Sequence, residues 1–356
     1  MNCLKIIKVI PVLFSSVVIN AQTLGGSSVF NFLKLSHSPQ LTALGGVNVS
    51  QTSNDIGLAF NNPALLRPSM HTQMNAVFNR FYADIQSYHL SLGFYNEKIQ
   101  TNFLYGIYFF NYGSITQTDA AGNVLGNLRP RDYVMQVSAG RQYLQKWNYG
   151  ATFKFINSNY GEFKSNGIAI DVGVLFSDSS KQFTASILAK NMGMQLKKYI
   201  GSAPEDLPFD LQVGISKKLE KAPFGFSITA HHLHRLDIRY NDTTFNNEND
   251  FGGDNNKKFS LDKIFRHFVF ATQVYAGKYI EVTAAYNHLR RKELNIGNSG
   301  NGTNGFSLGF AALLNKLQVR YATSWYQNNT SYHQFGINMK LNEYFGLGKF
   351  GERIGW

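Results

Sequence analysis

Apolar and polar residues alternate along most of the chain after about residue 70. One example is the stretch 149–155. There, Tyr149, Ala151, Phe153 and Phe155 alternate with Gly150, Thr152 and Lys154. Successive side chains of a β-strand point to opposite faces of its sheet, so the apolar set and the polar set lie on different faces. The pattern therefore predicts β-strands with one apolar and one polar face.

Fourteen such segments follow one another. We predict strands near residues 74–82, 86–95, 101–113, 132–145, 148–159, 166–178, 181–192, 208–219, 224–236, 266–277, 279–291, 305–314, 316–327 and 330–341. Short turns such as Gln145-Lys146 alternate with longer polar loops, near 116–131, 193–207, 237–265 and 292–304. An even number of strands with this loop asymmetry is typical of an outer-membrane β-barrel.

A soluble β-sandwich also alternates, so the length of the strands decides between the two folds. Most predicted strands have about 9–13 residues, whereas strands of soluble sheets usually have about 5–6. Aromatic residues such as Tyr143, Trp147 and Trp325 gather near strand ends, where lipid head groups favour them. We therefore expect an all-β fold, a transmembrane antiparallel barrel of about 14 strands.

The first strand sets the orientation of the barrel. If the N-terminus lies in the periplasm, every long loop falls on the outside of a Gram-negative cell, and both termini are periplasmic. A lumen formed by this many strands is too wide for inward side chains to fill. We expect residues 22–70, which lack alternation, to plug the lumen of a barrel formed by 71–341. Residues 342–356 would be a periplasmic extension.

The N-terminus has the features of a signal peptide. Lys5 and Lys8 precede an apolar run, and small residues precede Gln22, so we expect cleavage after residue 21. No later segment has the roughly 18–20 continuous apolar residues of a spanning helix. Cys3 is the only cysteine and lies inside the predicted signal peptide. The mature chain would then have no disulfide, no thiolate metal site and no cysteine nucleophile.

Charge adds little to this interpretation. Charged residues make up 16% of the chain and the formal net charge is +12, but the basic residues are scattered. Scattered charge does not indicate nucleic-acid binding. It favours attraction to anionic outer-membrane lipid and lipopolysaccharide, or to an acidic partner.

Specific motifs precede and follow the first strands. The segment 28–35 (SVFNFLKL) is followed by 43–50 (ALGGVNVS) and 59–66 (AFNNPALL), and later by 207–219 (LPFDLQVGISKKL) and 232–235 (HLHR). In this order the motifs resemble the PorV/PorQ family of outer-membrane components of the type IX secretion system, and most closely its PorQ-like members. The resemblance runs from about Gly25 to the end of the chain.

The resemblance implies a barrel similar to the fatty-acid-transporter type, with the N-terminal segment in or against the lumen. It also implies a non-enzymatic scaffold in the surface attachment complex. Such proteins hold the surface protein PorZ beside PorV and the sortase-like PorU, which links secreted cargo to lipopolysaccharide. The alternative function is an outer-membrane transporter for hydrophobic small molecules. No partner-binding residue follows from the resemblance.

The motif residues have a structural interpretation of their own. The residues concerned are Ala43, Leu44, Gly45, Gly46, Asn61, Asn62, Pro63, Ala64 and Leu65. Gly45 and Gly46 permit a positive φ or a close backbone approach in a confined lumen. Asn62 suits the N-cap of a short helix that begins at Pro63. An ordinary surface turn is the alternative.

Six charged residues fall on the predicted inward faces: Lys154, Asp171, Lys190, Glu281, Arg320 and Lys340. Facing lipid at mid-bilayer, such a charge would cost about 2–4 kcal/mol. We expect structural pairing inside the lumen rather than a transport pathway.

Candidate chemistry is sparse, and we predict no catalytic residue, no cofactor and no metal site. Ser307 lies in a Gly-x-Ser-x-Gly pattern, but inside a predicted strand rather than at a strand-to-helix turn. His231 points away from His232 and His234 if all three belong to a strand, which favours rim histidines over a two-histidine site completed by a loop carboxylate. The acidic loop 241–258 lacks calcium-binding spacing.

Overall fold

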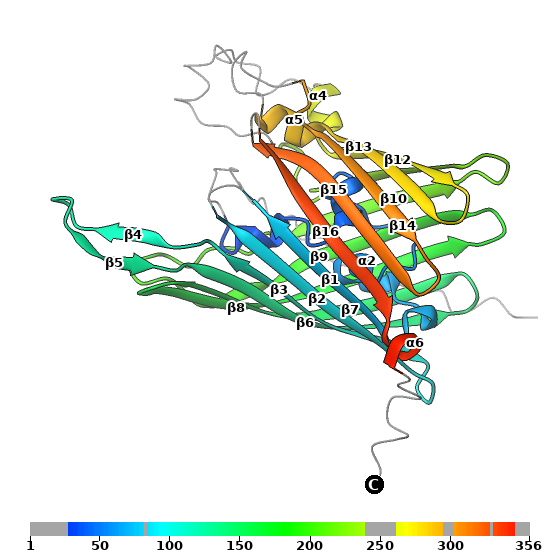
Figure 1. Ribbon diagram of the computed structural model, residues 1–356, viewed down its shortest axis with the longest axis horizontal. Coiled ribbons are helices and arrows are strands. Elements are labelled where there is room, and N and C mark those ends of the chain that lie inside the picture. The colour runs from blue at the N-terminus through cyan, green and yellow to red at the C-terminus, as the bar shows by residue number, and fades with distance from the viewer. Residues whose placement is uncertain (1–27, 82–83, 239–260, 295–301, 328–329, 346–356) are drawn as a thin grey trace, which may run out of the picture.

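In this computed structural model the described residues are 28–81, 84–238, 261–294, 302–327 and 330–345. Within them, fourteen antiparallel strands close into a barrel, and a further two-stranded hairpin extends away from it (Figure 1). The expected transmembrane barrel is therefore confirmed. None of the helices in the described ranges is long and apolar enough to cross a bilayer. The predicted signal peptide lies outside the described residues.

The barrel strands follow the predicted segments closely. They are β1 (Gln73–Arg80), β2 (Gln86–Asn96), β3 (Thr101–Asn111), β6 (Arg131–Tyr143), β7 (Trp147–Tyr160), β8 (Phe163–Asp178), β9 (Phe183–Lys197), β10 (Asp210–Lys218), β11 (Phe224–Ala230), β12 (Phe268–Ala276), β13 (Ile280–Asn287), β14 (Phe306–Leu313), β15 (Leu317–Gln327) and β16 (Thr330–Lys340). Each pairs with its neighbour in sequence order, and β1 pairs with β16 to close the barrel.

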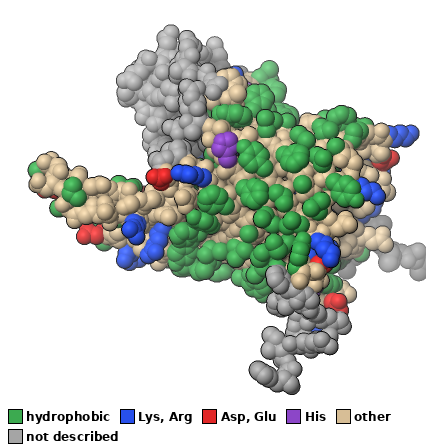
Figure 2. Space-filling model, in the orientation of Figure 1, with side chains coloured by type: hydrophobic (Ala, Val, Ile, Leu, Met, Phe, Trp, Pro, Cys, Tyr) green, Lys and Arg blue, Asp and Glu red, His purple; other side chains and the backbone are tan. Residues whose placement is uncertain are grey.

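The strands present an apolar belt to the outside. In β7, Tyr149 and Phe153 are exposed, whereas Thr152 and Lys154 are buried inside the barrel. Figure 2 shows apolar side chains covering the middle of the visible face, with most charged side chains nearer its margins. Because only helices and closed barrels satisfy their backbone hydrogen bonds in lipid, this belt marks the barrel as membrane-spanning.

The two ends of the barrel differ. At one end, which we name the short-turn end, β2, β6, β8, β10, β12 and β14 turn directly into the next strand. At the other, the long-loop end, β4 (Ile115–Thr118) and β5 (Val124–Leu128) form the projecting hairpin (Figure 1). The same end carries the short helices α4 (Leu261–Phe265) and α5 (His288–Leu294), while α6 (Leu341–Phe345) follows β16 at the short-turn end.

The segment 28–70 lies inside the barrel. It contains η1 (Asn31–Lys34), α1 (Pro39–Ala43), α2 (Ile56–Asn61), η2 (Pro63–Leu65) and η3 (Pro68–Met70). Ser38 caps α1 and Asp55 caps α2, each accepting a backbone N–H of the first turn. Phe30, Phe32 and Leu33 join a buried apolar cluster with inward residues of the wall such as Phe110 and Ile156.

Three predicted strand boundaries were wrong. The strand expected at 224–236 ends at Ala230, because His232 adopts a positive φ of 55° and the chain leaves the sheet. The strand expected at 279–291 ends at Asn287, where α5 begins. The strand expected at 181–192 continues to Lys197, paired with β8 alone beyond Lys190.

Candidate functional site

The segment 28–70, here called the plug, is fitted tightly into the wall. The side chain of Asn62 accepts a hydrogen bond from the backbone of Ala64 (3.0 Å), as predicted for an N-cap of η2. Its amide donates to Val49 in the plug (2.8 Å) and to Ser186 of β9 (2.9 Å). One side chain therefore caps a helix, braces the plug and attaches it to the barrel.

The wall has glycines at the positions where these plug residues pack against it. A Cβ added at Gly173 of β8 would overlap the side-chain oxygen of Asn62, and one at Gly150 of β7 would lie 2.6 Å from the carbonyl of Pro63. Further inward glycines meet the plug in the same way: Gly93, Gly106, Gly140, Gly214, Gly309 and Gly336. The wall is thus shaped to the plug over several strands.

The second half of the predicted motif forms a turn. Gly45 and Gly46 have φ angles of 88° and 82°, which confirms the expected left-handed conformation. The N–H of Gly46 donates to Leu41 (2.8 Å), and Asn287 of β13 donates to the carbonyl of Gly45 (3.1 Å). The turn is partly exposed at Gly46, but Gly45 lies against Val269 and Ala285 of the inner wall, so it is not an ordinary surface turn.

The remaining motif residues are apolar and buried. Ala43, Leu44, Ala64 and Leu65 are each at most 4% exposed. Ala43 fills the space above Gly309 of β14. The motif is therefore a structural contact between plug and wall, with no group left free for chemistry.

Two of the predicted inward charges pair with one another. Lys154 of β7 and Asp171 of β8 lie 2.6 Å apart, with 4% and 0% of their side chains exposed. Lys154 also donates to Asn191 of β9 (2.9 Å), and Asp171 accepts from the backbone of the same residue (2.7 Å). This buried cluster lies at the β8–β9 register shift and fixes its geometry.

The other predicted charges contact the plug or the short-turn end. Lys190 donates to Asn61 of the plug (2.6 Å). Arg320 lies 3.1 Å from Asp55 and 3.4 Å from Glu281, all three buried. Lys340 is partly exposed near Glu343 of α6 (3.5 Å).

Sequence reasoning missed two partners of these groups, the carboxylate of Asp55 and the amide of Asn191. Asp55 precedes α2 and has the usual position of an N-cap, but no pattern linked it to a strand 265 residues later in the chain. Asn191, which completes the Lys154 cluster, has a positive φ of 58° that alternation does not reveal. A buried charge needs compensation, so an inward arginine on a wall strand is a signal to look for acids both on the wall, as with Glu281, and in the plug, as with Asp55.

A polar cavity of about 740 Å³ opens at the short-turn end. The plug residues Gln51, Ser53 and Asn54 line it, together with wall residues that include Lys217 and Lys316. Arg67 donates to the carbonyl of Ser53, which holds this plug loop in place. Plug residues therefore form part of the lining of this cavity.

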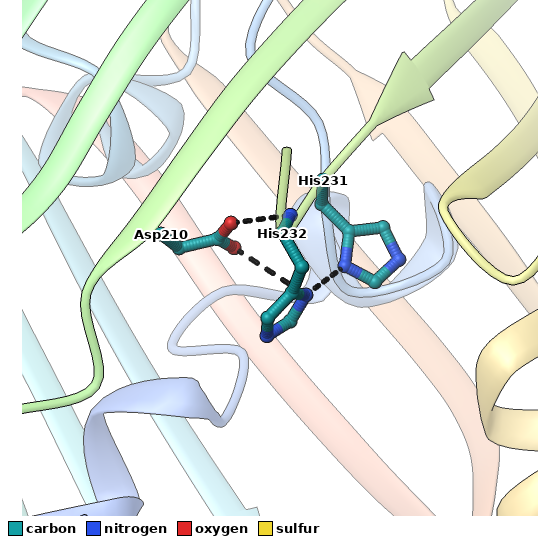
Figure 3. A group of neighbouring side chains, drawn as sticks. All are labelled: Asp210, His231 and His232. Atoms are coloured by element: carbon teal, nitrogen blue, oxygen red, sulfur yellow. Dashed lines mark hydrogen bonds and ion pairs between the residues drawn. The ribbon is translucent and has the colours of Figure 1, made fainter. Parts of the chain in front are cut away.

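A group of histidines lies where β10 begins and β11 ends, at the long-loop end (Figure 3). The Nδ1 atoms of His231 and His232 are 2.5 Å apart, and Nδ1 of His232 lies 4.0 Å from a carboxylate oxygen of Asp210. Asp210 also accepts the backbone N–H of His232 (2.6 Å). The expectation that His231 points away was wrong, because the strand has ended before the pair.

Burial disfavours the charged form of both imidazoles. It lowers the pKa of His231 well below its usual range, and it lowers the pKa of His232 although Asp210 opposes the shift. His234 packs against Phe209 and stays outside the group. One carboxylate oxygen of Asp210 and one ring nitrogen each of His231 and His232 lie within 4.8 Å of one another.

Ser307 is buried in β14 and shares a hydrogen bond with Ser324 of β15 (2.9 Å). Its hydrogen-bond partner is thus a serine and not a histidine, and Ser307 lies on a strand as expected. Its hydroxyl therefore forms a hydrogen bond between two neighbouring wall strands on the inner face of the barrel.

No protein-family model and no curated protein sequence matches the chain. Among solved structures, the chain is similar to the CymD monoaromatic hydrocarbon channel (13% identity, 87% of this chain and 97% of that one, TM-score 0.46). It is also similar to a TodX monoaromatic hydrocarbon channel mutant (10%, 86% and 98%, 0.48) and to the KdgM porin (4%, 75% and 98%, 0.32). The barrel is evident from the strand pairing itself.

Proposed function

We propose that this protein is a non-enzymatic outer-membrane anchor that holds an extracellular protein partner. Its short-turn end would face the periplasm and its long-loop end the cell surface. The motif resemblance to the PorV/PorQ family supports a place in the type IX secretion attachment complex. The partner would then be a PorZ-like surface protein, held close to PorU and PorV.

The observation that carries this proposal is the fit of the plug. Asn62 and Pro63 of the plug lie against wall glycines, and a Cβ added at those glycines would overlap them. Polar pairs such as Lys190 with Asn61 also join the plug to the wall. Moving such a plug would expose the buried apolar cluster. It would also leave buried polar groups without hydrogen-bond partners, and each such group costs about 1–3 kcal/mol. A permanently plugged barrel suits anchoring better than passage.

The β4–β5 hairpin is the natural contact surface. It projects beyond the barrel (Figure 1), and its apolar side chains Ile115, Val124 and Leu125 are 50%, 69% and 63% exposed. Exposed apolar side chains on an ordered arm outside the lipid belt favour burial against another protein. The long polar loop predicted near 116–131 corresponds to this arm, and the one near 193–207 corresponds to the end of β9 and the turn that follows it.

Deleting the arm tests the proposal. Residues 114–129 would be replaced by a short turn joining β3 to β6, and outer membranes would be solubilised in mild detergent for co-purification through a C-terminal tag. We expect loss of the PorZ-like partner while the barrel stays folded. A variant that keeps the arm but carries Val124→Thr and Leu125→Asn separates its apolar contacts from its backbone.

A second deletion, of residues 239–260, tests whether the long polar loop predicted near 237–265 contacts the partner; most of this loop lies outside the described residues. Retention of the partner in both deletions would contradict the anchor proposal at these surfaces. Recovery of the barrel without any attachment component would contradict the proposal as a whole.

Transport of hydrophobic small molecules is the second candidate, and one observation favours it. Beyond Lys190, β9 pairs with β8 but not with β10, and this part of β9 carries the exposed apolar residues Met192, Met194 and Leu196. An interruption of the pairing between two wall strands, flanked by apolar side chains, is the place in this wall for a lateral path into lipid. Such a path requires the plug to move.

A disulfide lock distinguishes the two functions. The hydroxyls of Ser50 in the plug and Ser216 of β10 are 2.8 Å apart, so Ser50→Cys with Ser216→Cys can form a bond of about 2.05 Å with little movement. Uptake of a hydrophobic dye into vesicles that stops on oxidation and returns on reduction would support transport. Partner retention unaffected by oxidation, without uptake, would support anchoring.

A further inference from the structure

The histidine group at the long-loop end has an unusual arrangement for side chains without a ligand. Nδ1 of His231 and Nδ1 of His232 approach to 2.5 Å, and the carboxylate of Asp210 lies beside them. At this separation either one imidazole donates a hydrogen bond to the other, or the two Nδ1 atoms bind the same cation. His231 is 1% exposed, so its ring cannot turn to solvent for another partner.

We propose that Asp210, His231 and His232 bind a divalent transition-metal ion of the zinc class. Two imidazole nitrogens and one carboxylate oxygen are a common ligand set for zinc, which leaves a fourth position for water or for a ligand from a partner. The three ligand atoms already lie within 4.8 Å of one another. This site is independent of the anchoring function.

A tetrahedral zinc ion requires the distances between these ligand atoms, which are all within 4.8 Å, to change by at most about 1.5 Å. Ligands about 2.0–2.1 Å from a tetrahedral zinc ion lie about 3.3 Å apart. The two Nδ1 atoms would separate by somewhat less than 1 Å, and the carboxylate oxygen now 4.0 Å from His232 would move closer by a similar amount. His232 is partly exposed, so its side chain has room for this change.

Supporting contacts hold the ligands in place. Gln212 donates to Asp210 (2.6 Å), which orients the carboxylate, as neighbours of metal ligands commonly do. Nδ1 of His267, next to β12, lies 2.8 Å from the carbonyl of His231. A bound ion would therefore link the ends of β10 and β11, and through His267 the start of β12.

The test uses the full-length protein purified in detergent with a tag that contains no histidine. After treatment with a chelator, zinc binding would be measured by calorimetry and metal content by mass spectrometry. We expect one equivalent of zinc, with binding at least tenfold weaker in Asp210→Asn and in His232→Ala. Asp210→Asn keeps the size of the side chain, so folding is preserved.

His234→Ala is the matched control, because His234 is adjacent to the group but outside it. Unchanged zinc binding in this variant is expected. Cobalt(II) added to the stripped protein provides a second readout, since its visible absorption distinguishes tetrahedral from octahedral coordination. Binding that is absent in the wild type, or that survives both Asp210→Asn and His232→Ala, would overturn the site and leave a proton shared between two imidazoles.

Discussion

Asn62 of the plug lies against Gly173 of β8 so closely that even a methyl group on the glycine would overlap the asparagine side chain. The same asparagine caps η2 and donates to Ser186 of β9. Asn62 is therefore needed for the local conformation of the plug, and Gly173 is needed for the wall to pack against Asn62. Through this contact the motif residues 61–65 hold the plug inside the lumen.

Gly173→Ala should loosen this contact. The added Cβ would force Asn62 from its position, and overpacking of this kind costs about 1–3 kcal/mol. Urea unfolding of the barrel in detergent would measure the loss, and single-channel recording in planar bilayers would detect any leak. Gly302→Ala is the control, because no heavy atom lies within 4 Å of a Cβ there. Equal stability of the two variants would contradict the tight fit.

The buried pair of Lys154 and Asp171 gives a second prediction. Lys154→Met leaves a buried carboxylate without its cation, and removing one partner of a buried pair costs about 3–5 kcal/mol. The double variant Lys154→Met with Asp171→Leu should recover most of that loss, because both charges are gone. The measurement is again urea unfolding in detergent.

For this pair the double variant decides the interpretation. A double variant as unstable as the single one would mean that the hydrogen bonds of Asn191 dominate, rather than the ion pair. The exposed pair of Arg80 and Asp84 supplies a reference, since Arg80→Met should change stability by less than about 1 kcal/mol.

The sequence predicted the barrel well because alternation is a local property. Each predicted strand overlaps a strand of the barrel, since every pair of neighbours such as Thr152 and Phe153 reports which face is inward. The N-cap of Asn62 and the turn at Gly45 were likewise predictable, because capping and a positive φ depend on a few adjacent residues.

Features that depend on distant residues were not predictable. Arg320 finds Asp55 in the plug, and no spacing in the sequence relates them. His231 and His232 converge because Asp210 of the neighbouring strand captures a backbone N–H and the chain leaves the sheet. The β4–β5 hairpin was missed because its short strands resemble a polar loop.

The outward face of the barrel can be tested at Val172 of β8, which is 44% exposed within the apolar belt. Val172→Arg would place a charge toward the acyl chains, at a cost of about 2–4 kcal/mol near the bilayer midplane. Unfolding in lipid vesicles would measure it. Val124→Arg, on the projecting hairpin, should cost less than about 0.5 kcal/mol because that side chain is exposed outside the belt. Similar losses for both would contradict the position of the belt.

Asp262 organises the helices at the long-loop end. Its carboxylate contacts Arg266 (2.8 Å), His288 (3.0 Å) and Lys292 (3.3 Å), which joins α4 to α5. Asp262→Asn should therefore raise hydrogen exchange in 261–266 and 288–294 several-fold. Asp84→Asn, which removes an exposed acid from β1–β2 at the same end, should leave this exchange unchanged.

The pH dependence of these helices follows from the same carboxylate. Burial alone would raise the pKa of Asp262, but hydrogen bonds from His288 and Arg266 outweigh it and hold the pKa below its usual range. An unfolded aspartate releases its proton near pH 3.9, so the contribution of Asp262 is complete above about pH 4 and is lost as the pH falls through the lowered pKa. Hydrogen exchange, corrected for its intrinsic pH dependence, should show equal protection of 261–266 at pH 7 and pH 5. Loss of protection between these values would show that another group, rather than Asp262, controls the joint between α4 and α5.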